Sequence, residues 1–299
     1  MRSLTAAAPA ALFAALVAAP ALADHPVTIN FVAEVAGTPF TCAQAYDGIG
    51  VTGSTVEVAD SRVFVTNARL IGADGAETPI ALDQDGIWQL DNVALLDFED
   101  ATGTCVNGTP AMNTTLRGTV PAGDYTGFAF DIGVPFALNH GDPTLAPSPL
   151  NLTRLFWNWQ GGYKFITIDL ATSGQPIEAA QTAGDHSGQA LAAPSARSWS
   201  LHLGSTGCAS EARTVPPVAQ CANPNLVAVR FDAFDPVANT VIFDVAPVLA
   251  EANVDMNTPE TSPGCMSFLN DDDCVPVMSR LGLPFRDIPA GEQLFATMR

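Results

Sequence analysis

The stretch from Val27 to Val35 has the sequence VTINFVAEV, in which apolar and polar residues alternate. Successive side chains of a β-strand point to opposite faces of a sheet, so this alternation is typical of a strand with one buried face. Segments rich in β-branched or aromatic residues recur along the chain, at residues 54–58, 62–70, 127–133, 164–170, 198–203, 226–231 and 240–245. Short strands at this spacing predict an all-β fold.

Turn-forming residues separate these segments, as at Asp85-Gly86 and Gly161-Gly162. The Ala/Gly/Gln/Ser-rich stretch from Ser173 to Pro194 predicts a surface loop. We therefore expect one β-sandwich or barrel-like domain over residues 24–299, with long loops. The region from about Ala222 is expected to be small and irregular, and it is a candidate for an appended subregion.

Composition excludes several classes of partner. The chain is 47% hydrophobic and 14% charged, which is too apolar for a disordered protein. It has 12 Lys and Arg against 31 Asp and Glu, and its formal net charge is −19. Binding to a nucleic-acid backbone or to anionic lipid requires basic residues that neutralise phosphates. The sequence thus excludes nucleic acid and leaves metal cations and basic proteins open.

The N-terminus has the pattern of a secretory signal peptide over residues 1–23. Arg2 supplies the positive charge, Ala6–Ala19 is a short apolar segment, and Ala21-Leu22-Ala23 fits a cleavage site. The apolar segment is too short and too interrupted by proline for a membrane anchor. We expect cleavage near Ala23, export from the cytoplasm and no membrane insertion.

The six cysteines are Cys42, Cys105, Cys208, Cys221, Cys265 and Cys274. An even number in an exported protein predicts disulfides, and the absence of any C-x-x-C spacing argues against zinc ribbons and c-type haem attachment. Sequence alone allows many pairings. We favour the local pairs Cys208–Cys221 and Cys265–Cys274, which leaves Cys42–Cys105 as a long-range link.

Acidic residues give little support for a hydrolase. No G-x-S-x-G motif is present, so a nucleophilic serine of that type lacks its signature. Asp97, Glu99 and Asp100 are candidates for a carboxylate pair, although acids in an acidic protein are usually solvated. The run 271–273 resembles part of a calcium loop but lacks the terminal bidentate glutamate. We expect both groups to be solvated.

Two histidines and one tryptophan pair stand out. His140 follows a predicted strand, and His202 lies in one directly before a cysteine. Imidazole is a common metal ligand, but a strand histidine is more often a hydrogen-bonded core residue. In an extended segment the indoles of Trp157 and Trp159 would point the same way, which also suits a buried aromatic pair.

Several of these stretches together resemble a known family. They are YDGIG (46–50), the segment WQ to ALLDFED (88–100), VPFALNH (134–140), SPLNLTRLFWNWQGGYKF (148–165), LHLGSTGC (201–208) and the C-terminal GCMSF and DDDC. This order of motifs resembles the MbnP-like periplasmic proteins, also called the metallo-mystery pair four-Cys motif family. The resemblance extends over nearly the whole chain after residue 23.

The resemblance implies a periplasmic copper-binding protein that is not itself an enzyme. In that family a di-haem, cytochrome c peroxidase-like partner of the MbnH type oxidises a tryptophan to kynurenine, whose aniline nitrogen then helps to bind copper. Carried over to this chain, the candidate ligands are His140 and His202, with His25 as an extra one. The tryptophans that are candidates for oxidation are Trp157, Trp159 and, at lower rank, Trp88.

Two other functional classes compete with this interpretation. A structural or adhesion module of the cell envelope would use the tryptophan pair as core and the histidines as hydrogen-bonded residues. A hydrolase with paired acids ranks last, because neither a nucleophile nor a metal-ligand spacing supports it. The family resemblance therefore gives the leading hypothesis, and the adhesion module is its alternative.

Overall fold

The computed structural model describes residues 24–174 and 198–299. Its strands are β1 Asp24–Val35, β2 Thr38–Pro39, β3 Ala45–Ile49, β4 Ser54–Gly72, β5 Glu77–Pro79, β6 Ala81–Leu82, β7 Gln89–Leu90, β8 Val93–Asp97, β9 Thr115–Pro121, β10 Tyr125–Ile132, β11 Phe156–Asn158, β12 Gly162–Thr172, β13 Ser198–Gly204, β14 Val227–Phe231, β15 Thr240–Asp244, β16 Gly264–Cys265 and β17 Ala296–Met298. Its short helices are α1 Phe136–Asn139, α2 Ala246–Leu249, α3 Val275–Met278 and the 3₁₀ turns η1 Thr153–Leu155 and η3 Asp272–Cys274. The expected signal peptide, His186 and most of the expected loop at 173–194 lie outside the described residues.

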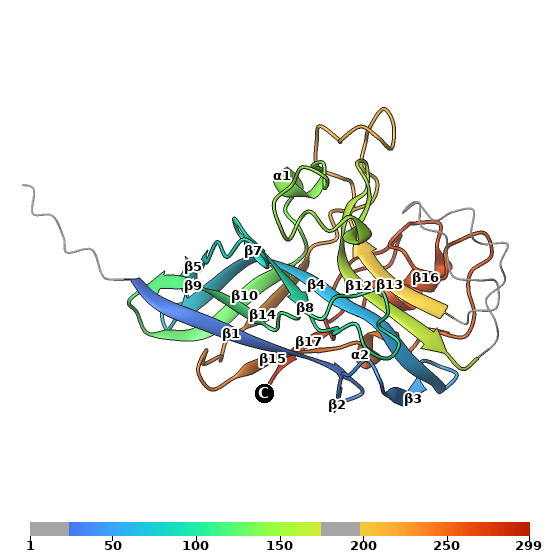
Figure 1. The fold of residues 1–299 in the computed structure, drawn as a ribbon, viewed down its shortest axis with the longest axis horizontal. Coiled ribbons are helices and arrows are strands. Elements are labelled where there is room, and N and C mark those ends of the chain that lie inside the picture. Colours follow the sequence, from blue (N-terminus) through green and yellow to red (C-terminus); the bar gives the residue numbers. More distant parts are fainter. Residues whose placement is uncertain (1–23, 175–197) are drawn as a thin grey trace, which may run out of the picture.

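Two sheets pack against each other, which confirms the all-β prediction (Figure 1). The smaller sheet has the strand order β17-β15-β1-β9-β6, and β2 pairs with β1. The larger sheet has the order β14-β10-β4-β12-β13-β16, with β3, β5 and β8 also on β4, β7 on β8 and β11 on β12. The predicted segments correspond to β1, β4, β10, β12, β13, β14 and β15, with two of them in β4, whereas β9, which is as long as β13, was not predicted.

Aromatic side chains fill the space between the sheets. Phe31 of β1 lies with its ring centroid 5.8 Å from that of Phe130 on β10 and 5.6 Å from that of Phe243 on β15. All three side chains are buried, and Phe31 is 1% exposed. Phe31 therefore contacts both sheets at the centre of the core, in the alternating stretch that first indicated a strand.

The C-terminal region contributes to both sheets. β14 pairs with β10 in the larger sheet, and β15 pairs in parallel with β1 in the smaller one. Between β15 and β17 the chain is irregular and contains only short elements. Residues from about 222 onward thus complete the sandwich and do not form a sheet of their own.

Three disulfides link the loops in the pairing favoured from the sequence. Cys42–Cys105 joins positions 63 residues apart, whereas Cys208–Cys221 and Cys265–Cys274 close loops of 13 and 9 residues. No described helix is long and apolar enough to cross a membrane. The disulfides and the sandwich together hold the loops that carry the candidate functional residues.

The central position of Phe31 predicts a large loss of stability on truncation. Phe31→Ala should lower the free energy of unfolding by about 3–5 kcal/mol, because it leaves a cavity between two sheets. Val237→Ala, at a side chain that is 93% exposed, is the control and should change it by less than about 0.5 kcal/mol. Urea titration followed by circular dichroism measures both; a loss below about 1 kcal/mol for Phe31→Ala would contradict this packing.

Candidate metal centre

The tryptophan pair lies at a hairpin between β11 and β12. Trp157 is in β11, which ends at Asn158, so Trp159 begins the turn that leads to Gly162. The two indoles therefore do not share one extended strand. The prediction from the sequence had placed both in a single extended segment. Asn158 stabilises the turn, because its Oδ1 accepts the backbone N–H of Gly161 at 2.8 Å.

The Trp157 indole packs across the end of β13. A Cβ placed on Gly204 would lie 2.5 Å from Cζ3 of Trp157, so the ring occupies the space that any side chain at 204 would need. On its other side the indole packs against Phe268, with centroids 5.5 Å apart. Trp157 is 7% exposed. Only glycine at position 204 permits this contact.

His202 is oriented by a carboxylate on the neighbouring strand. Its Nε2 lies 2.8 Å from Oδ1 of Asp169 on β12, and its backbone partner across the strands is Thr167. Burial alone would raise the pKa of Asp169, but the charge and hydrogen bond of His202 lower it well below its usual range. Nδ1 of His202 has no hydrogen-bond partner among the described residues. A carboxylate that holds one ring nitrogen in this way is a usual partner of a metal-ligating histidine.

Trp157 and His202 lie on the same face of β13. Residues two apart in a strand point to the same side, and His202 precedes Gly204 by two positions. The alternate residues Leu201 and Leu203 point into the core instead. Alternate residues along a strand are about 7 Å apart, so the position that the indole covers is one side-chain repeat along β13 from His202.

His140 occupies a second, separate environment beside the same hairpin. Its Nδ1 lies 3.1 Å from the carbonyl oxygen of Trp159, which can only accept, so Nδ1 carries the proton. Its Nε2 lies 3.2 Å from Nδ2 of Asn139 and 3.6 Å from Sγ of Cys221. The side chain is buried, and burial lowers its pKa. His140 is therefore a neutral imidazole with its lone pair on Nε2.

His140, Cys208 and Cys221 form a compact group of potential ligand atoms, within 4.8 Å of one another. The two sulfurs are joined in a disulfide, and metals bind the thiolate rather than the disulfide. Among the described residues no other group of three or more His, Cys, Asp or Glu converges in this way. The sequence-predicted set of His25, His140 and His202 is not brought together.

The remaining candidates lie elsewhere. His25 is exposed near the start of β1, which Figure 1 shows at the left end of the molecule, away from α1 and β13. Trp88 is half-buried and makes no described contact with His140 or His202. Trp199 is fully buried on the core face of β13. Position thus favours Trp157 and Trp159 over the other tryptophans as candidates for oxidation near a histidine.

A pocket of about 180 Å³ opens beside the hairpin. Gly161 and Phe268, which both contact Trp157, form part of its wall, and Cys208 forms another part. Arg213 contributes the one basic side chain of the lining. The pocket therefore gives solvent a route to Cys208, whose disulfide partner Cys221 lies beside His140.

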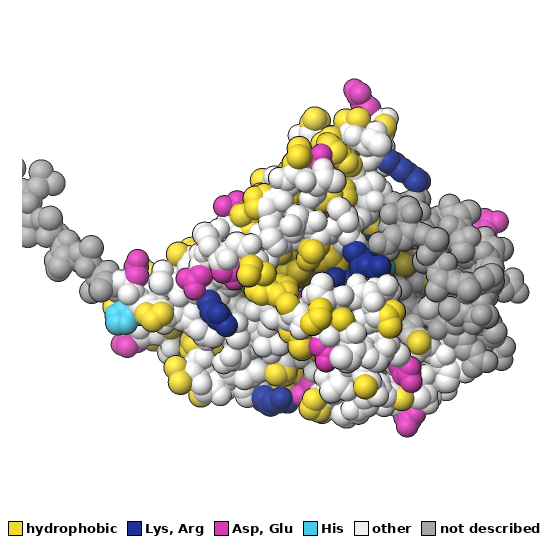
Figure 2. All heavy atoms as spheres, viewed as in Figure 1, with side chains coloured by type: hydrophobic (Ala, Val, Ile, Leu, Met, Phe, Trp, Pro, Cys, Tyr) yellow, Lys and Arg dark blue, Asp and Glu magenta, His cyan; other side chains and the backbone are white. Residues whose placement is uncertain are grey.

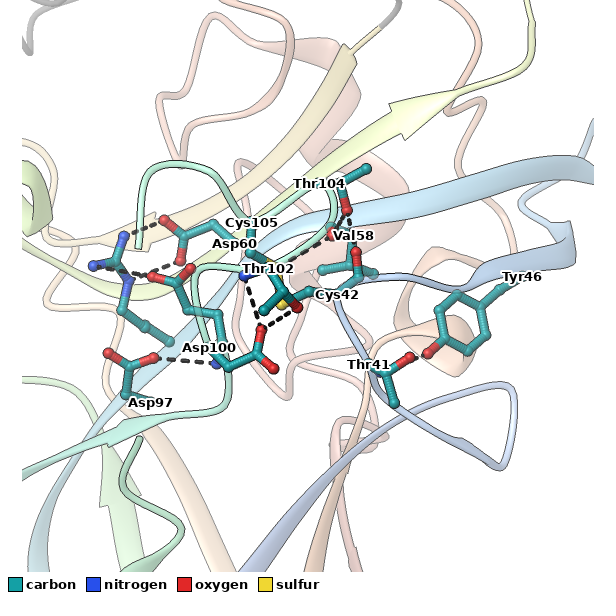
Figure 3. Close-up of a disulfide and its surroundings, with 12 residues drawn as sticks. Thr41, Cys42, Tyr46, Val58, Asp60, Asp97, Asp100, Thr102, Thr104 and Cys105 are labelled. Atoms are coloured by element: carbon teal, nitrogen blue, oxygen red, sulfur yellow. Dashed lines mark hydrogen bonds and ion pairs between the residues drawn. A yellow bond between two sulfur atoms is a disulfide. The ribbon is translucent and has the colours of Figure 1, made fainter. Parts of the chain in front are cut away.

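A row of charged side chains continues from His202 across the sheet. Asp169 is paired across the strands with Asp60 of β4, and Asp60 accepts from Nε of Arg62 at 2.8 Å. Nη1 of Arg62 lies 3.7 Å from Oε1 of Glu99. Figure 3 shows the neighbouring Asp60 and Asp97 beside the Cys42–Cys105 disulfide.

The expectation that Asp97 and Glu99 are solvated is wrong. They are 2% and 0% exposed, because the loop that carries Cys105 covers them and Gly108 packs directly on the Glu99 carboxylate. Neither oxygen of Glu99 has a hydrogen-bond partner among the described residues. Burial raises the pKa of Glu99 to about 8 and that of Asp97 to about 7, and the charge of Arg62 only partly offsets this.

The run 271–273 is also not a solvated turn throughout. Asp271 is 1% exposed, and its carboxylate accepts the backbone N–H groups of Met266 and Asp273 at 3.1 and 3.0 Å. Asp273 accepts the N–H of Thr258 at 2.9 Å, and Asp272 forms an ion pair with Arg286. These acids fix the loop around Cys274, and a calcium ligand role has no support.

The buried carboxyls predict a stability that depends on pH. Because their pKa values are raised, the folded state binds these protons more tightly than the unfolded chain does. Their contribution to the free energy of unfolding is complete below about pH 4 and is lost as the pH rises through their folded pKa values of about 7 and about 8. Glu99→Gln should therefore be more stable than wild type at about pH 8.5, by about 1–3 kcal/mol.

The same difference should vanish below about pH 4, where Glu99 is protonated in both the folded and the unfolded chain. Urea titrations at a series of pH values measure it, with Glu57→Gln on the exposed side of β4 as the matched control. Parallel profiles for wild type and Glu99→Gln would contradict the assignment of a protonated Glu99 at neutral pH.

Comparison with known proteins places the fold and the site in context. A family model for MbnP matches residues 24–267. The solved structure of MbnP from Methylosinus trichosporium is similar with a TM-score of 0.78 and 31% sequence identity, over 93% of this chain and 99% of that one. No curated protein sequence shows a significant match. The family model covers well over half of the chain, and on this ground the protein belongs to the MbnP family.

Proposed function

We propose that this protein binds copper in the periplasm, at a site formed by His202 and by a kynurenine that a partner makes from Trp157. It acts as a binder or carrier and not as an enzyme. The observation that carries the proposal is the position of the Trp157 indole over Gly204, on the face of β13 that also bears His202. Membership of the MbnP family supports a role related to metals.

The residues present suit such a site. An unmodified indole nitrogen is a poor ligand, because its lone pair belongs to the aromatic system. Opening of the ring gives an aniline nitrogen that can join an imidazole around copper. His202 meets the usual requirement for a ligating histidine, since its other ring nitrogen is held by the Asp169 carboxylate.

The oxidation needs a partner that supplies redox chemistry. Cleavage of the indole C2–C3 bond adds two oxygen atoms, which a di-haem peroxidase of the MbnH type takes from hydrogen peroxide with release of water. Hydrolysis of the resulting N-formylkynurenine releases formate and leaves kynurenine. Trp157 is 7% exposed, so oxidation by electron transfer to the haem protein suits it better than direct contact with the haem.

The molecular surface fits docking to a basic protein. The net charge is −19, and Figure 2 shows acidic side chains scattered over the visible face with few basic ones. An acidic surface attracts cations and speeds association with a partner of opposite charge. Three disulfides suit an oxidising compartment outside the cytoplasm.

Co-expression with the di-haem partner tests the modification. We expect wild type and Trp159→Phe to gain about 4 Da, the mass change from tryptophan to kynurenine, and Trp157→Phe to gain nothing. Intact-mass spectrometry with peptide mapping reads this out, and expression without the partner is the control. A gain located on Trp159 or Trp88, or no gain with an active partner, would refute the choice of Trp157.

Copper affinity of the modified protein tests the ligand. His202→Ala should weaken copper binding about 100-fold, and Asp169→Asn should weaken it about tenfold because the imidazole loses its orienting partner. His25→Ala is the matched control and should bind as wild type does. Competition titration against a copper chelator measures all four proteins, after circular dichroism has shown that they are folded. Unchanged binding by His202→Ala would exclude it as a ligand.

A further inference from the structure

We propose that reduction of the Cys208–Cys221 disulfide creates a second metal site, in which both sulfurs and the His140 imidazole bind Cu(I). The three ligand atoms already lie within 4.8 Å of one another, and all three residues are buried. Two thiolates and one imidazole form a soft ligand set of the kind that suits Cu(I). The site lies at the loop between β13 and β14 and does not include Trp157 or His202.

The hydrogen bonds around His140 prepare it as a ligand. The carbonyl of Trp159 accepts a hydrogen bond from Nδ1 of His140. Oδ1 of Asn139 accepts the backbone N–H of Tyr163, so the other atom of this amide, Nδ2, is the donor toward Nε2 of His140. Both constraints place the lone pair on Nε2, on the side of the sulfurs. A ligating histidine characteristically donates its other N–H to a carbonyl or carboxylate, as His140 does.

The spacing between His140 and Cys221 already suits a metal, whereas the two sulfurs, which are bonded to each other in the disulfide, separate on reduction. Nε2 of His140 is 3.6 Å from Sγ of Cys221. A metal with a bond of about 2.3 Å to sulfur and about 2.0 Å to nitrogen separates these two ligands by about 3.5 Å at a tetrahedral angle. Asn139 keeps a partner when Nε2 turns to the metal, because its Nδ2 also lies 3.4 Å from Oγ of Ser205.

The disulfide is reachable from solvent through the pocket beside the hairpin. Cys208 forms part of that pocket wall, next to Ser205 and Arg213. A dithiol reductant transfers two electrons to the disulfide, which yields two cysteine thiols and the oxidised cyclic disulfide of the reductant. Binding of Cu(I) then displaces one proton from each thiol, with no further change in oxidation state.

Cys265–Cys274 provides an internal control for this inference. It closes a loop of similar length and is more deeply buried, with both cysteines 0% exposed against 7% and 5% for Cys208 and Cys221. No histidine belongs to a ligand group with it among the described residues. If paired thiols alone sufficed, both disulfides would yield copper sites on reduction. The histidine distinguishes the first pair from the second.

The test uses the full mature protein made without the haem partner, so that no kynurenine is present. The protein is reduced with a dithiol, freed of reductant and titrated with Cu(I) buffered by a chelator. We expect one tightly bound Cu(I) in wild type and in Cys265→Ser/Cys274→Ser, and at least a 100-fold weaker affinity in Cys208→Ser/Cys221→Ser. The affinity of His140→Ala for Cu(I) should fall about tenfold, and X-ray absorption should show copper with both sulfur and nitrogen neighbours in wild type and in Cys265→Ser/Cys274→Ser.

Thiol alkylation of wild type provides a measurement that needs no variant to fold. Bound Cu(I) should slow the alkylation of Cys208 and Cys221 by iodoacetamide relative to the reduced, copper-free protein. It should leave the rates at Cys265 and Cys274 unchanged, as peptide mapping would show. An equal effect of Cu(I) on all four alkylation rates, or equal Cu(I) affinity after loss of Cys208 and Cys221, would overturn the proposal. Trp157→Phe should leave this site intact, so failure here and failure of the proposed kynurenine site are separable.

Discussion

The alternation of side chains along β4 is the constraint on which the rest of the structure depends. Ser61 and Val63 point toward the other sheet, where the core around Phe31 forms, whereas Asp60 and Arg62 point to the opposite face. Val58 also faces the core, because a register shift in the pairing with β12 lies between Val58 and Asp60. Since β12 and β13 continue the same register, that outer face carries Asp169 and then His202. One pattern of alternation therefore builds both the hydrophobic core and the polar face on which the candidate metal ligand is placed.

The hairpin between β11 and β12 connects this face to the chemistry of tryptophan. Trp157 covers Gly204, which lies two residues along β13 from His202, and the carbonyl of Trp159 holds His140. Ser267 strengthens the arrangement, because it bridges the carbonyl of His202 and the N–H of Gly204 directly before Phe268. The two environments differ in what accompanies the imidazole, a carboxylate in one and a disulfide in the other.

Sequence reasoning predicted the strands well, because alternation and β-branched content report directly on a half-buried sheet. It located β1, β4 and β13 and the disulfide pairs, but it took Asp97 and Glu99 for solvated acids. Their burial depends on a loop closed by Cys105, and local sequence contains no signal of such long-range coverage. The grouping of His140 with Cys221 was missed for the same reason. Asp169 was detectable in principle, as a lone acid in the otherwise β-branched and apolar strand 164–170.

The most direct test of the account is a crystal structure of the protein after treatment with its haem partner and one equivalent of copper. Anomalous scattering at the copper edge locates the metal without reference to any assumed ligand. The account predicts a copper peak within bonding distance of Nδ1 of His202 and of an aniline nitrogen at residue 157. A peak beside His25, or an unmodified indole over Gly204 with copper bound elsewhere, would contradict it.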